Sequence, residues 1–178
     1  DVYKRQDTVS LGFRNGWDGL WGLRLHALKE RAPVQSVLYE HVNTKRQSSR
    51  RSELEQGLIG TDNYYNHFVY SSGWTHRGRS IGMPLILTEP GFYGVTNNIL
   101  LAHHMGLEGW LTPTASYRLL GTYTRNYGAH SILPTDGSPR FENARFDTPA
   151  HQYTVMVDLT SVLSHRYAID GFLRLAYD

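Results

Sequence analysis

The sequence predicts an all-β fold, an antiparallel up-and-down transmembrane β-barrel, incomplete here, with about six spanning strands of a larger barrel. Three observations predict it. Several segments alternate apolar and polar residues with the period of two that places successive side chains on opposite faces of a strand. The connections between these segments are alternately short and long. No stretch of the chain holds the roughly 20 apolar residues that a membrane helix needs.

The first two strand candidates are residues 15–28 and residues 34–43. In the first, Trp21 and Leu23 share an apolar face, whereas Arg24 lies on the opposite, mostly polar face. The second alternates more weakly. The short link between them contains a proline, which cannot donate a hydrogen bond to a strand ladder, so we expect the chain to turn there.

The remaining candidates are residues 97–109, 116–127, 151–162 and 167–178. The last alternates strictly, with tyrosine, isoleucine and leucine on one face and a largely polar face that carries two aspartates and one arginine. A membrane-spanning strand needs about 9–11 residues, and each candidate is long enough. Ordinary strands average about 5–6 residues, so these lengths favour a barrel over a soluble sheet.

Two long segments, 44–96 and 128–150, are rich in Gly, Asn, Ser and Pro and are expected to be loops. Both then lie at one rim of the barrel, while the short links lie at the other, as in outer-membrane barrels. We therefore expect residues 7–178 to be part of a single barrel domain with a long extracellular excursion at 44–96. Residues 1–6 resemble translated sequencing adapter and are excluded. The chain is expected to be a C-terminal portion, with its targeting signal missing.

Composition narrows the classes of function. The chain has 178 residues, no cysteine and a formal net charge of +2. The absence of cysteine excludes disulfides and thiolate metal sites, and the small charge argues against a nucleic-acid partner. The adjacent His103 and His104 face opposite ways in a strand and do not chelate one ion. No metal and no cofactor is expected.

No catalytic motif is present. The sequence lacks a Gly-x-Ser-x-Gly elbow and a His-Glu-x-x-His helix motif, and nothing fixes the spacing of the carboxylate pair that glycoside hydrolysis needs. No catalytic residue is expected, and the protein is not expected to be an enzyme.

Four motifs carry a resemblance to a known family. Residues 60–67 are Gly-Thr-Asp-Asn-Tyr-Tyr-Asn-His, and residues 72–85 are Ser-Gly-Trp-Thr-His-Arg-Gly-Arg-Ser-Ile-Gly-Met-Pro-Leu. Residues 102–106, Ala-His-His-Met-Gly, and 123–128, Tyr-Thr-Arg-Asn-Tyr-Gly, follow. Together they resemble the capsule assembly Wzi family of Bacteroidetes-type bacteria. The resemblance implies a barrel in the cell outer membrane, surrounded by outer-membrane lipid, with a lectin-like role. Its partner would be capsular polysaccharide or exopolysaccharide at the cell surface.

The chemistry of the excursion suggests where a glycan would bind. Polysaccharides offer C–H faces to aromatic rings, and hydroxyls and carboxylates to polar side chains; arginine holds carboxylates in bidentate fashion. The residues expected to contact carbohydrate are Asp62, Asn63, Tyr64, Tyr65, Asn66, His67, Trp74, Arg77 and Arg79. A structural alternative stays open, in which Asp62 and Asn63 form an Asx-turn and the aromatic residues pack the loop.

Two other functions remain open. A general outer-membrane channel or porin would have the same alternating strands and a charged lumen. A soluble carbohydrate-active β-sandwich also alternates apolar and polar residues, and it would bury its apolar faces between two sheets.

Overall fold

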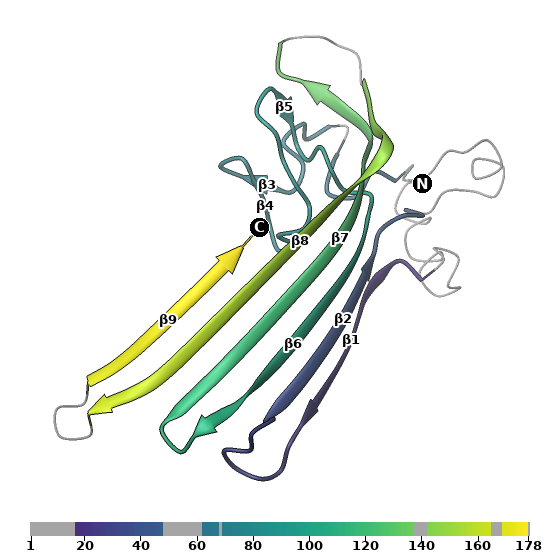
Figure 1. The fold of residues 1–178 in the computed structure, drawn as a ribbon. Helices are drawn as coiled ribbons and strands as arrows, with labels where there is room; N and C mark the ends of the chain where they lie inside the picture. Colours follow the sequence, from purple (N-terminus) through teal and green to yellow (C-terminus); the bar gives the residue numbers. More distant parts are fainter. Residues whose placement is uncertain (1–16, 48–61, 68, 137–141, 165–168, 178) are drawn as a thin grey trace. The chain divides into compact units, whose positions relative to one another are not determined.

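The computed structural model describes residues 17–47, 62–67, 69–136, 142–164 and 169–177 (Figure 1). These residues are all-β, with no helix among them, and most strands belong to one largely antiparallel sheet. In the described part of the chain, no helix has the length and hydropathy to cross a bilayer. The prediction of an all-β, antiparallel fold is therefore confirmed.

Six long strands form the main sheet, and each lies beside its neighbour in chain order (Figure 1). They are β1 (Gly19–His26), β2 (Ser36–Asn43), β6 (Leu100–Thr112), β7 (Ala115–Pro134), β8 (Glu142–Ser164) and β9 (Ile169–Tyr177). β8 and β9 pair antiparallel, with Asp158 opposite Arg174. Each of the six overlaps one predicted strand, and the order is that of a meander.

Three short strands lie in the segment between β2 and β6. They are β3 (Thr75–His76), β4 (Arg79–Ser80) and β5 (Phe92–Tyr93). β3 and β4 pair with each other as a separate two-stranded sheet, and β5 pairs with the end of β7. The described part of residues 44–96 therefore contains no strand of spanning length, as predicted.

The predicted loop at 128–150 is wrong over most of its length. β7 continues to Pro134, and β8 already begins at Glu142. Gly128 lies inside β7 at φ 82°, a conformation that favours glycine, and its carbonyl accepts hydrogen bonds from the backbone N–H groups of Asn98 and Ile99. Of the prolines that suggested a loop, Pro134 ends β7 and Pro149 lies inside β8, whereas Pro139 lies outside the described residues.

The chain divides into two compact units. We call the described residues of 1–19, 42–101 and 125–150 the loop unit. We call those of 20–41, 102–124 and 151–178 the sheet unit. The loop unit has a small apolar core, in which Ile86, Val95, Ile99 and Ala129 are buried. It also buries amide and hydroxyl side chains, including Gln47, Asn97 and Asn98.

The sheet unit has two contrasting faces. Contacts between neighbouring strands join odd-numbered to odd-numbered side chains, as in Tyr39 with His103, and even-numbered to even-numbered ones, as in His104 with Thr122. The odd-numbered residues make what we call the apolar face. Its large side chains are 37–65% exposed: Trp21, Leu23, Leu25, Val37, Tyr39, Met105, Leu111, Leu119, Tyr153, Val155 and Leu159. The even-numbered residues, which include Arg24, Glu108 and Arg118, make the polar face.

Candidate glycan-binding site

The predicted carbohydrate segment is held in the loop unit by one buried residue, through its backbone and its side chain. Gln47 is fully buried, and its backbone N–H donates to the Asp18 carboxylate at 2.6 Å. Its carbonyl accepts from the backbone N–H of Asp62 at 3.0 Å, and its Oε1 accepts from that of Tyr64 at 3.0 Å. These bonds fix the start of the segment, where Asp62 itself is exposed.

Asn63 is used for the architecture of the loop unit. Its Nδ2 donates to the Ser131 carbonyl at 2.8 Å and lies 3.0 Å from the Ser131 hydroxyl. Its Oδ1 accepts from Asn66 at 3.1 Å and from Asn98 at 2.9 Å. The Asn63 side chain thus joins three parts of the chain, and the Asx-turn alternative stays a prediction for Asp62.

The Asn66 side chain pairs with both backbone groups of Val95, as the backbone of a neighbouring strand would. Its Nδ2 donates to the Val95 carbonyl at 2.9 Å, and its Oδ1 accepts from the Val95 N–H at 2.7 Å. Val95 is fully buried, so Asn66 satisfies two backbone groups that water does not reach. The predicted glycan contacts of Asn63 and Asn66 stay predictions, but their amides already have protein partners.

His67 and the two tyrosines shape the next turn. His67 Nδ1 accepts from the backbone N–H groups of Val69 and Tyr70 at 3.1 and 3.2 Å. The Tyr65 carbonyl accepts from the Trp74 N–H at 2.7 Å, and Tyr64 and Tyr65 are both half-buried. This part of the segment therefore brings the chain to the β3–β4 hairpin.

The hairpin turns through Arg77 and Gly78, at φ 50° and 73°. Positive φ at both central residues is typical of the two-residue type I′ turn, whose twist suits a hairpin. Thr75 lies opposite Ser80, and His76 lies opposite Arg79. The Ile81 N–H donates to the Trp74 carbonyl at 2.9 Å, which extends the pairing by one step.

This register gives the hairpin an inner and an outer face. Thr75 and Ser80 are half-buried, and their hydroxyls donate to backbone carbonyls of the loop unit. Because side chains alternate along a strand, the residues on either side of them share the outer face. Trp74 is 66% exposed and Ile81 is 48% exposed, and His76 and Arg79 are exposed beside them.

The outer face offers an aromatic surface next to unpaired cations. Within the described residues, neither Arg77 nor Arg79 forms an ion pair. Arg77 stands at the tip of the hairpin and is exposed. A free guanidinium presents a fork of N–H donors that matches a carboxylate. The face is therefore suited to a sugar that stacks on Trp74 and carries a negative charge.

The structure thus separates the predicted set. Trp74, Arg77 and Arg79 come together on the hairpin, whereas Asn63 and Asn66 are bound inside the loop unit. His76 and Ile81 complete the outer face but were not in the predicted set. The sequence signal for them was that the small hydroxyl residues Thr75 and Ser80 alternate with larger side chains on both sides of Arg77-Gly78.

The described residues contain no group of three His, Cys, Asp or Glu side chains that could hold a metal ion. The two adjacent histidines have separate partners. His103 Nδ1 lies 2.8 Å from the Tyr39 hydroxyl on the apolar face, and His104 Nδ1 lies 2.7 Å from the Thr122 hydroxyl on the polar face.

Comparison of the chain with protein-family models, with curated proteins and with solved structures finds no match. The case for a function therefore depends on the geometry above and on the motifs in the sequence.

Proposed function

We propose that this chain is part of an outer-membrane β-barrel with a lectin-like role, and that it binds capsular polysaccharide or exopolysaccharide at the cell surface during capsule assembly. The β3–β4 hairpin binds the glycan, and the apolar face of the sheet unit contacts lipid. The protein captures the polymer and does not cleave it.

The observation that carries the membrane part is the exposed apolar face. Among the described residues of the sheet unit, the exposed large apolar side chains on β1, β2, β6, β7 and β8 lie on this face, with Leu20 of β1 as the exception, and Leu23, Met105 and Leu111 are each more than 60% exposed. Soluble proteins rarely leave so continuous an apolar surface in water. A β-sandwich would cover it with a second sheet, so the exposure argues against the soluble alternative. Lipid hydrocarbon is the partner that an alternating antiparallel sheet of this kind fits.

A row of aromatic and histidine side chains crosses the apolar face. The Tyr39 hydroxyl meets His103, and the Tyr123 hydroxyl meets His151, both at 2.8 Å. The Tyr123 and Tyr153 rings are 5.0 Å apart. Membrane barrels have girdles of aromatic residues where the hydrocarbon meets the headgroups, and this row supports such a boundary.

The observation that carries the binding part is the outer face of the hairpin. It places Trp74 on the same face as Arg79, with Arg77 at the tip, and the described residues provide no carboxylate to pair with either arginine. The meander also supports the location, because the connection that contains the hairpin leaves from the strand ends opposite to the short links. Long loops of outer-membrane barrels lie on the extracellular side.

A channel is the second candidate, and one observation favours it. On the polar face, Glu108 of β6 pairs with Arg118 on the neighbouring β7 and with Arg24 on β1, across β2. A row of charges across strands is what an aqueous lumen contains. Planar bilayers distinguish the two functions: a channel gives steady ion conductance, whereas a plugged lectin conducts poorly.

Retention of acidic exopolysaccharide by the refolded chain tests the proposal. Trp74→Ala should weaken retention at least about tenfold, or about 1.4 kcal/mol, with Trp21→Ala, on the sheet, as the matched control. Arg79→Gln should weaken binding of acidic but not of neutral polymer, with the exposed Lys29→Gln as its control. Equal retention by the Trp74 and Trp21 variants would refute the site.

A further inference from the structure

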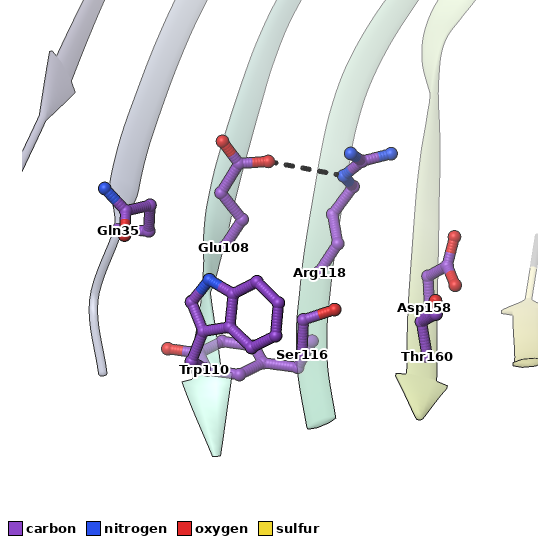
Figure 2. Close-up of a pocket in the computed structure, with 9 residues that line it drawn as sticks. Gln35, Glu108, Trp110, Ser116, Arg118, Asp158 and Thr160 are labelled. Atoms are coloured by element: carbon purple, nitrogen blue, oxygen red, sulfur yellow. Dashed lines mark ion pairs between the residues drawn. The ribbon is translucent and has the colours of Figure 1, made fainter. Parts of the chain in front are cut away.

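The polar face of the sheet unit contains a pocket of about 340 Å³ against β6, β7 and β8 (Figure 2). Its volume is in the lower part of the roughly 300–1,000 Å³ range of small-molecule sites. The side chains that matter are Glu108, Trp110, Ser116, Arg118, Asp158 and Thr160. None of them belongs to the carbohydrate segment described above.

The pattern of the strands explains why these six side chains share a face. All have even numbers, and even-numbered side chains meet across β6 and β7, as Glu108 and Arg118 do. Figure 2 shows Trp110 beside Ser116, with Asp158 and Thr160 on the next strand. The alternation that makes the opposite face apolar therefore brings these six side chains together, and Gln35, Gly109 and Tyr117 complete the lining.

Trp110 forms a fixed flat wall. Its backbone N–H donates to the Ala32 carbonyl at 3.1 Å, and the Arg31 guanidinium lies 5.2 Å from the centre of its ring. The guanidinium occupies one face of the ring, and the Trp110 side chain also lines the pocket. The indole N–H has no acceptor in the described part of the chain, so it is also available to donate.

The charges around the pocket are largely compensated. One Glu108 oxygen accepts from Arg24, and the other lies 3.5 Å from Arg118 Nε. Asp158 adds a second carboxylate to the wall, and Arg24 Nε donates to the Ser36 hydroxyl at 2.8 Å. The two carboxylates and one guanidinium of the wall have Arg24 and Arg31 beside them, so the charges nearly balance and the pocket lacks the unopposed cations of the hairpin.

We propose that this pocket is a subsite for an uncharged pyranose ring. The C–H face of the sugar stacks on Trp110, and its hydroxyls donate to Asp158 and accept from the free Arg118 Nη groups. The Ser116 and Thr160 hydroxyls act as adaptable donors or acceptors beside them. The inference needs only the sheet unit, so it does not depend on the membrane setting or on glycan capture by the hairpin.

The test measures binding of glucose, galactose, mannose and N-acetylglucosamine to the full chain in detergent micelles, by saturation-transfer NMR, with glucuronate as the charged comparison. We expect at least one neutral sugar to bind, and glucuronate to bind at least about threefold more weakly. Trp110→Ala should weaken binding of the neutral sugar at least about tenfold. Trp74→Ala should leave this binding unchanged, which separates the pocket from the hairpin site.

Two milder variants test the pocket in case Trp110→Ala does not fold. Asp158→Asn keeps the shape of the side chain and should weaken binding of the neutral sugar about three- to tenfold, and Ser116→Ala should weaken it less. The proposal is overturned if none of the four neutral sugars binds, if glucuronate binds as well as they do, or if Trp110→Ala and Asp158→Asn bind like the unaltered chain.

Discussion

Asn66 gives a quantitative test of how the loop unit is held together. Its side chain satisfies both backbone groups of Val95, at 2.9 and 2.7 Å, and also donates to Asn63 at 3.1 Å. Val95 is fully buried, so Asn66→Ala leaves an N–H and a C=O without partners. Each such group costs about 1–3 kcal/mol. Because Asn66 is only half-buried, water will recover part of that, and we expect a loss of about 2–4 kcal/mol.

Hydrogen exchange measures this loss directly. In Asn66→Ala the Val95 amide should exchange roughly 30- to 1,000-fold faster, which is the same free energy expressed as an opening equilibrium. Asp62→Ala is the control, because Asp62 is exposed and its bond to Gln47 uses the backbone only; it should change stability by less than about 0.5 kcal/mol. Unchanged exchange at Val95 in the Asn66 variant would refute the reasoning.

Three further substitutions test other parts of the account. In vesicles, Leu119→Arg on the apolar face should lower the free energy of unfolding by about 2–4 kcal/mol, whereas Leu120→Arg, on the polar face, should lower it by less than about 1 kcal/mol. Equal losses in urea titrations would contradict a sheet with one apolar and one polar face. Gly73→Ala places a Cβ against the Tyr65 carbonyl at φ 55°, so the β3–β4 hairpin should be cleaved faster in limited proteolysis, and an unchanged rate would count against that packing. Glu108→Gln should cost less than about 1 kcal/mol, because Arg24 and Arg118 are more than half exposed; a loss above about 2 kcal/mol would mean that the ion pairs are stronger than their exposure indicates.

The strands could be predicted from the sequence because alternation is a local signal. β6 and β9 lie within about three residues of their predicted boundaries. The extensions of β7 and β8 could not be predicted from the sequence, because they depend on partners distant in sequence. The pairing of β5 with the end of β7 and the hydrogen bonds to the Gly128 carbonyl appear only when the chain is folded.

The candidate site shows the same division. The sequence identified a segment with the right chemistry, but it did not show which amides bind other parts of the protein. Asn63 and Asn66 find partners up to 68 residues away in sequence, and such bonds leave no local pattern. The pocket at Trp110 was missed because its residues come from three strands, and each contributes only the ordinary polar half of an alternating segment.

The central claim is that the odd-numbered face of the sheet lies in hydrocarbon. The chain contains no cysteine, so single cysteines can be placed at successive positions from 117 to 122 in β7 and spin-labelled after refolding into vesicles. The claim predicts that accessibility to oxygen alternates with a period of two, highest at the odd positions, with the water-soluble nickel reagent reaching only the even ones. Nickel accessibility at positions 119 and 121 equal to that at 120 and 122 would contradict it.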